Sequence, residues 1–146
     1  MPGELPERLE AGTQNMHGIA GLYEGIKFVK RIGVKNIAEH ERRLIGYAVE
    51  KLSEIEGIRI YNGPLEIMSG VLSFRVEGME SEDAAYELAK REIAVRAGLH
   101  CAPLAHRSAG TLPEGTVRMS VSRFSRKRDV DYLAGGLRDI VKRKKR

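Results

Sequence analysis

Two amphipathic segments fill the first part of the chain. Apolar side chains recur at spacings of three and four from Gly18 to Gly33 and again up to Gly57, which is the period of one face of an α-helix. Gly33 interrupts the pattern, and Asn36 followed by Glu39 resembles a capping box at a helix start. We predict two helices, or one long helix bent at Gly33. Their apolar faces consist of Ile19, Leu22, Ile26 and Val29, and of Leu44, Ile45, Ala48, Leu52 and Ile55.

Short alternating runs then predict four strands. Residues 58–61 and 71–76 alternate in polarity and are separated by the turn signal Asn-Gly-Pro at 62–64. Residues 94–96 and 116–122 have the same character, and the second of these places Val117, Met119 and Val121 on one side.

Two more helices complete the pattern. Ser81, followed by two acidic residues, is expected to start one helix, and Ser125 is expected to cap the last. Their predicted apolar faces are Ala85, Leu88 and Ala89, and Val130, Leu133, Leu137, Ile140 and Val141. The order favours an α+β fold in which a long helical segment precedes a small, mostly antiparallel sheet packed with helices. Residues 1–16 read as an extended lead-in and residues 17–146 as one domain.

Length and composition narrow the function classes. The 146 residues suffice for one domain with a hydrophobic core. No apolar run is long enough to span a bilayer, and the N-terminus lacks the pattern of a secretory signal. We therefore expect a cytoplasmic protein. The net charge of +5 comes largely from the basic residues 142–146. Such a tail can bind nucleic acid or anionic membrane. A solvated terminus is the commoner case, and we expect neither partner.

The segment 97–115 is the strongest candidate for chemistry, because it carries no helical or strand pattern and loops of this length are usually functional or disordered. It contains the single cysteine, Cys101, next to His100 and close to Arg96. Nearby positive charge favours the thiolate, so Cys101 suits a nucleophile, although a buried structural cysteine is an open alternative. Arg118, on the following strand and pointing away from the apolar side, could hold a carboxylate or simply face solvent.

These residues could also be considered as ligands of a zinc ion. His100, Cys101, His106 and His17 are potential ligands, but their spacing fits no usual structural zinc pattern. We therefore expect no metal.

Three segments together resemble one family. Residues 8–15 read Arg-Leu-Glu-Ala-Gly-Thr-Gln-Asn, residues 96–103 read Arg-Ala-Gly-Leu-His-Cys-Ala-Pro, and residues 115–120 read Gly-Thr-Val-Arg-Met-Ser. In this order they resemble the R-x-E-A-G-T-x-N segment, the active-site cysteine loop and the following strand of cysteine desulfurases in the class V aminotransferase family. The resemblance spans nearly the whole chain.

The resemblance implies a fold, a reaction and residue roles. The fold would be the C-terminal small domain of a fold type I enzyme that uses pyridoxal 5'-phosphate (PLP). Cys101 would take sulfur from L-cysteine as a persulfide and pass it to an acceptor protein. Arg118 would bind the substrate carboxylate, with Arg96 and His100 in the same pocket, and Thr13 would contact the PLP phosphate across a dimer interface.

This sequence differs from the family pattern at one point that bears on whether the chain can be active alone. The family's Schiff-base lysine follows a histidine upstream of the segment that residues 8–15 resemble, and no lysine of this chain follows a histidine. We therefore expect a fragment that does not bind PLP alone and needs a lysine-bearing N-terminal half. We also expect a homo-oligomer, since the first helix has an apolar face that would stay exposed.

Three alternatives stay open. They are a class V aminotransferase fragment without desulfurase activity, a stand-alone domain that carries a persulfide, and a basic nucleic-acid-binding module. The thiol of Cys101 favours the desulfurase interpretation, because an aminotransferase does not need one.

Overall fold

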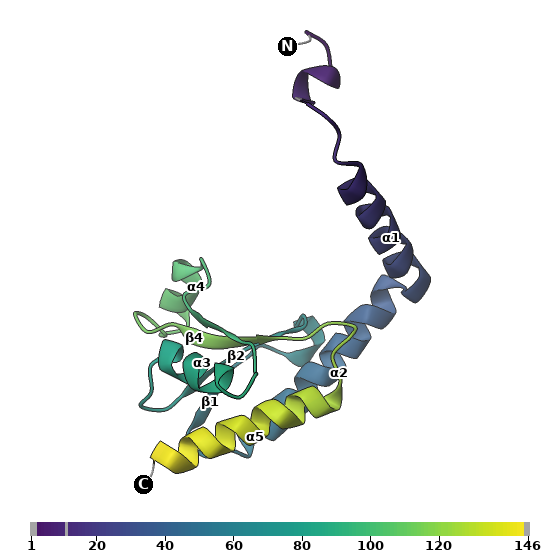
Figure 1. The fold of residues 1–146 in the computed structure, drawn as a ribbon. Helices are drawn as coiled ribbons and strands as arrows, with labels where there is room; N and C mark the ends of the chain where they lie inside the picture. Colours follow the sequence, from purple (N-terminus) through teal and green to yellow (C-terminus); the bar gives the residue numbers. More distant parts are fainter. Residues whose placement is uncertain (1–2, 11, 145–146) are drawn as a thin grey trace. The chain divides into compact units, whose positions relative to one another are not determined.

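The computed structural model describes residues 3–10 and 12–144 of the chain (Figure 1). Ala11 of the first motif, and Lys145 and Arg146 of the basic tail, lie outside these described residues. The chain divides into two compact units, one up to Asn36 and the other from Ile37 onward. None of the described helices is both long enough and apolar enough to cross a membrane.

The N-terminal unit consists of a short 3-10 helix, η1 (Glu7–Leu9), and the helix α1 (Met16–Ile32). The Asn15 side chain accepts a hydrogen bond from the Gly18 N–H and so caps α1. The helix ends at Gly33, whose φ of 88° suits glycine. The predicted apolar face exists but is not covered, because no residue of α1 is buried.

The predicted capping box at Asn36 is wrong. The helix α2 (Val34–Ser53) begins two residues earlier, so Asn36 lies inside its first turn. The Asn36 side-chain amide instead donates to the Ile32 carbonyl at 2.7 Å, which satisfies a carbonyl at the end of α1. Glu39 pairs with Arg43 along the helix surface, at 3.7 Å.

The second unit contains the predicted antiparallel sheet. Its strands are β1 (Ile58–Tyr61), β2 (Val71–Val76), β3 (Arg96–Gly98) and β4 (Thr116–Ser120), in the spatial order β1-β2-β4-β3. Two boundaries differ from expectation. β3 begins two residues late, because the Ile93 N–H still bonds to the Leu88 carbonyl at the end of the preceding helix. β4 ends at Ser120, beyond which the Val121 N–H bonds to the Gly70 carbonyl.

One face of the sheet is covered by helices. α2 packs there with α3 (Ser81–Ala89) and α5 (Lys127–Lys144) (Figure 1). The predicted faces of α2 and α5 are confirmed, except that Val141 is only partly buried, whereas α3 buries Ala84 in place of the predicted Ala89. The fully buried side chains of this core include Ile45, Leu52, Leu72, Phe74, Leu88, Val117, Val130 and Leu137.

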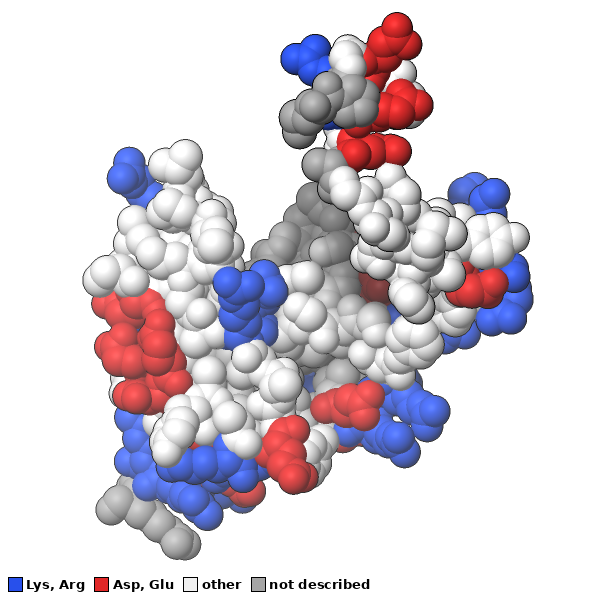
Figure 2. Space-filling model, turned by 45° about the horizontal axis from the view of Figure 1, so that its top comes forward, with Lys and Arg blue, Asp and Glu red and all other residues white. Residues whose placement is uncertain are grey.

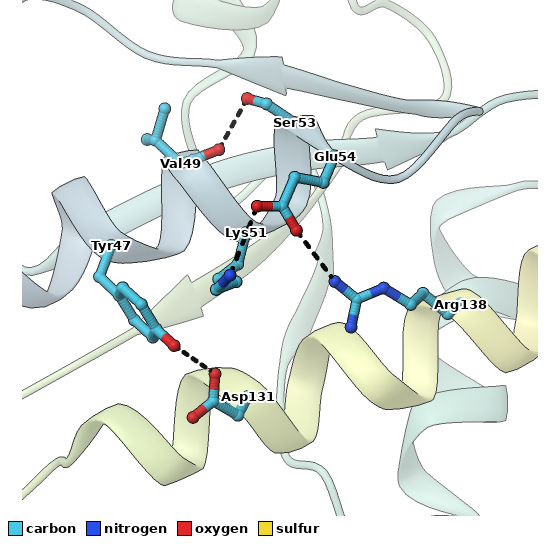
Figure 3. A network of polar contacts seen from close by, with 7 residues as sticks. All are labelled: Tyr47, Val49, Lys51, Ser53, Glu54, Asp131 and Arg138. Atoms are coloured by element: carbon cyan, nitrogen blue, oxygen red, sulfur yellow. Dashed lines mark hydrogen bonds and ion pairs between the residues drawn. The ribbon is translucent and has the colours of Figure 1, made fainter.

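Polar contacts also join α2 to α5 (Figure 3). The Tyr47 hydroxyl donates to Asp131 at 2.6 Å, and this hydrogen bond raises the pKa of Tyr47. Arg138 lies 3.3 Å from Glu54, which also contacts Lys51. Exposed pairs of this kind contribute at most about 1 kcal/mol each, so the apolar core carries most of the stability.

The predicted helix start at Ser81 is confirmed, but neither Ser81 nor Ser125 caps its helix through its side chain. Ser81 is the first residue of α3 and is buried, and Glu80 precedes it. The Ser125 hydroxyl accepts from the Ser122 N–H in the preceding turn. The carboxylate of Asp129, in the first turn of α5, accepts from the Arg126 N–H and supplies the cap instead.

Candidate functional site

The segment between β3 and β4 is ordered, which corrects the expectation of an irregular loop over residues 97–115. It completes β3, makes a turn, forms the short helix α4 (Pro103–Ser108) and returns to the sheet at Gly115. Gly98 and Gly115 close this excursion with φ values of 97° and 68°, and a Cβ on Gly115 would overlap the backbone of Gly98. Gly115 is therefore required by close backbone contact, and the positive φ of Gly98 favours glycine there.

Cys101 lies at the tip of a strained turn. The Ala102 N–H bonds to the Leu99 carbonyl at 2.8 Å, and the two central residues, His100 and Cys101, have φ values of 51° and 60°. Positive φ at both central positions is typical of a type I′ turn, which normally uses Asn and Gly. Each non-glycine residue there costs on the order of 1 kcal/mol. The fold bears this cost and leaves Cys101 exposed.

Two arginines face each other across the sheet. Arg96 on β3 pairs directly with Arg118 on β4, and Arg118 pairs on its other side with Ser73. Tyr61 on β1 lies opposite Ser73, so the four residues form one row on the face away from the helices. Like charges in this position repel, and the Arg118 Nε is buried without a hydrogen-bond partner. A bound anion would relieve both defects.

His100 is held beside this row as a neutral imidazole. Its Nε2 lies 3.1 Å from the Thr116 carbonyl, which can only accept, so the proton is on Nε2. Nδ1 is then a free acceptor, and it is buried without a partner. Desolvation lowers the pKa of His100, and the positive charge of Arg118 lowers it further.

These groups share one cavity of about 340 Å³. It is lined by Tyr61, Ser73, His100, Ala102, Ala105, His106, Ala109, Thr111, Thr116 and Arg118. The wall of the cavity therefore includes the Arg118 cation and the imidazole of His100. This combination fits a small carboxylate that also carries a donor group.

The structure brings most of the predicted site residues together. Arg96, His100, Cys101 and Arg118 lie around one end of the sheet, although Cys101 is beside the cavity and not among its lining residues. Thr13 is exposed and belongs to the other compact unit. In the part of the chain that the structure describes, no three His, Cys, Asp or Glu side chains gather as metal ligands would.

Sequence reasoning missed the other members of the row and of the cavity wall, chiefly Tyr61, Ser73, Thr111 and Thr116. Ser73 could have been found, because it is a polar residue on the outward side of a strand. Its position opposite Arg118 depends on the pairing register, which the sequence pattern does not reveal.

The fold and site define an α+β domain with a cavity lined by an arginine and two histidines, beside an exposed thiol. Comparison with known proteins gives the family. The sequence matches aminotransferase class V over residues 3–133, and the chain belongs to that family.

Several similar proteins and solved structures are cysteine desulfurases. The chain is 36% identical over 140 residues to the cysteine desulfurase of Wigglesworthia glossinidia brevipalpis, covering 95% of this chain and 33% of that protein. The apo structure of the cysteine desulfurase from Thermococcus onnurineus NA1 matches with a TM-score of 0.84 and 37% identity, over 94% of this chain and 34% of that one. CsdA from Escherichia coli matches with a TM-score of 0.81 and 29% identity, over 94% and 33%. The chain thus spans about a third of the length of these relatives.

Proposed function

We propose that this chain supplies the substrate-binding and sulfur-accepting part of a PLP-dependent cysteine desulfurase. The observation that carries the proposal is that Arg118, whose buried Nε has no hydrogen-bond partner, lines the same cavity as His100, the residue next to Cys101 in the turn. A substrate carboxylate would neutralise the Arg96–Arg118 pair and give Arg118 the hydrogen bond that it lacks.

In this proposal Cys101 is the sulfur acceptor. The sulfur of L-cysteine leaves its carbon, which keeps the bonding electron pair, and joins the Cys101 sulfur as a persulfide. An exposed position suits a group that must next deliver sulfur to an acceptor protein. The thiol also separates this proposal from an aminotransferase fragment, whose chemistry needs no such group.

The cavity residues do not fit PLP on their own. Among the described residues that line the cavity there is no lysine, so the amine that holds PLP in this family has to come from outside the cavity. We propose that a lysine-bearing part, equivalent to the remaining two-thirds of the relatives, supplies it, and that Thr13 contacts the PLP phosphate in the assembly. When bound there, PLP supplies the electron sink for the reaction.

The exposed face of α1 supports assembly with further protein. Ile19, Leu22 and Ile26 are 50%, 66% and 47% exposed, and large apolar side chains left uncovered along one face favour association. A homo-oligomer would cover this face.

A complementation assay tests the proposal. The chain is mixed with the lysine-bearing two-thirds of a relative, PLP and L-cysteine, and sulfide is measured in the presence of a reductant. We expect sulfide from the mixture and none from either part alone. Cys101→Ser and Arg118→Met should each abolish release, whereas His17→Phe should not. Full release with the Cys101→Ser chain would contradict the proposal.

A further inference from the structure

The sheet carries a second pair of opposed arginines, outside the row that contains Arg118. Arg59 on β1 and Arg75 on β2 are direct cross-strand partners. The neighbours of Arg59 along the strand, Ile58 and Ile60, pack against the core. Because side chains alternate along a strand, both arginines lie on the face away from the helices. Like charges in directly opposite positions destabilise a sheet, so this pair has a cost that its fold alone does not explain.

The charge of this pair is only partly compensated. Arg75 lies 3.3 Å from the carboxylate of Glu114, in the segment that leads into β4. Arg59 is exposed, and its guanidinium lies over the ring of Tyr61, 5.4 Å from the ring centroid. Among the described residues no carboxylate pairs with Arg59. Glu114 thus shows that a carboxylate fits beside this pair, and the Arg59 guanidinium is available for a second one.

The arginine pair adjoins the site proposed above. Arg59, Arg75 and Tyr61 line a cavity of about 190 Å³. Tyr61 also lines the cavity that contains His100 and Arg118. An ordinary protein interface covers about 800 Å² of each partner, which is enough to include both cavities. A protein that approaches Cys101 from this face would therefore also meet the arginine pair.

The surroundings favour an acidic protein over a nucleic acid. Two carboxylates, Glu77 and Glu114, lie beside the arginines, and they oppose a run of closely spaced phosphates more than an isolated carboxylate. The ring of Tyr61 already stacks with Arg59, so it offers no free face to a base. The planar guanidinium of Arg59, in contrast, matches a carboxylate through two parallel hydrogen bonds.

We propose that Arg59 and Arg75 dock an acidic segment of the protein that takes sulfur from Cys101, with a carboxylate of that segment on Arg59. The inference rests on the proposed function, because it takes Cys101 as the group that gives up sulfur. It adds the chemistry of the acceptor, which carries acidic residues beside its accepting group. Charge complementarity of this kind speeds the encounter and selects the partner.

The test uses two peptides, each with a single cysteine, flanked by glutamates in one and by glutamines in the other. Cys101 is first converted into a mixed disulfide with the uncharged label thiopyridine. The peptide thiolate attacks the Cys101 sulfur, forms a disulfide with it and releases thiopyridone, whose absorbance gives the rate. Each rate is divided by that of the same peptide with free dipyridyl disulfide, which corrects for the reactivity of its thiol. We expect the acidic peptide to react roughly tenfold faster at low salt, and this preference to disappear at about 0.5 M salt.

Four variants locate the effect. Arg59→Gln and Arg75→Gln should each reduce the preference for the acidic peptide roughly threefold. Glu114→Gln frees Arg75 from its own carboxylate and should increase the preference. Arg43→Gln is the matched control, because it removes the same charge from an exposed position on α2, and it should leave the preference nearly unchanged.

The outcomes separate the inference from the proposed function. Equal rates for the two peptides, or a preference that Arg59→Gln and Arg75→Gln reduce no more than Arg43→Gln, would overturn the inference alone. So would an oligouridylate of the same net charge that binds more tightly than the acidic peptide and loses this binding in Arg59→Gln. The exchange needs neither PLP nor the lysine-bearing part. Full sulfide release by the Cys101→Ser chain in the complementation assay would instead overturn the proposed function, and the inference with it.

Discussion

Replacing Arg118 should stabilise the fold while it removes the carboxylate site. Two unfavourable terms act on Arg118. Its buried, unpaired Nε costs about 1–3 kcal/mol, and Arg96 directly opposite on β3 adds about 0.2–1 kcal/mol of repulsion. Arg118→Met keeps a side chain that reaches as far as the arginine Nε position and removes both terms. Allowing for relaxation and partial screening, we expect a gain of about 1–2 kcal/mol in the free energy of unfolding.

Thermal unfolding by circular dichroism measures this effect. For a unit of this size, 1 kcal/mol corresponds to about 4 °C, so the melting temperature should rise by about 4–8 °C. Arg96→Met is the matched control, because Arg96 is exposed and its replacement relieves only the repulsion; a gain of about 1–3 °C is expected. An Arg118→Met protein that melts at or below the wild-type temperature would refute the reasoning that Arg118 is strained for the sake of a ligand.

Three further predictions concern other positions. Gly135→Ala meets open space and should raise stability by up to about 1 kcal/mol, whereas Gly136→Ala should gain clearly less, because its Cβ would lie 2.9 Å from the terminal methyl of Ile93, which has to shift; urea unfolding distinguishes them. Glu92→Gly should raise the melting temperature, since Glu92 has a φ of 58° at the end of α3, and a lower value would contradict this account of the turn. The pKa of His100 is lowered in the folded state, so the unfolded state binds a proton at this residue more readily than the folded state. The folded state therefore loses stability as the pH falls below about 6.5, the ordinary pKa of histidine. Wild type should therefore lose more stability than His100→Gln between about pH 7.5 and about pH 5, and equal losses would exclude this role.

Periodicity was enough to predict the longer helices α1, α2, α3 and α5 and the sheet. The faces of α2 and α5 and the outward position of Arg118 follow from spacings of three, four and two, and the structure confirms them. The start of α3 at Ser81 was predicted correctly, whereas Asn36 and Ser125 were wrongly predicted as caps, because their side chains bond elsewhere.

The cavity could be predicted only in part. The motifs point to Arg96, His100, Cys101 and Arg118, which are close in sequence or pair between neighbouring strands. The row that adds Tyr61 and Ser73 depends on strand order and register, which long-range pairing decides. α4 was missed because a helix of six residues has too few turns to show a period.

The basic tail does not enter this account of function. Lys142, Arg143 and Lys144 form the last turn of α5, where Lys and Arg gather in the view of Figure 2. Cations at a helix C-terminus interact favourably with its dipole, which gives these residues a structural role. Nucleic-acid binding by these residues is an alternative that we do not expect, and a salt titration of binding would test it.

The mass of Cys101 after reaction tests the central claim most directly. The chain is incubated with L-cysteine and PLP, with and without the lysine-bearing part of a relative, and the peptide that contains Cys101 is analysed by mass spectrometry without a reductant. The account predicts that Cys101 gains one sulfur atom only when the lysine-bearing part is present, and that the Cys101→Ser peptide gains none. A gain of sulfur by the chain alone, or no gain in a mixture that releases sulfide, would contradict it.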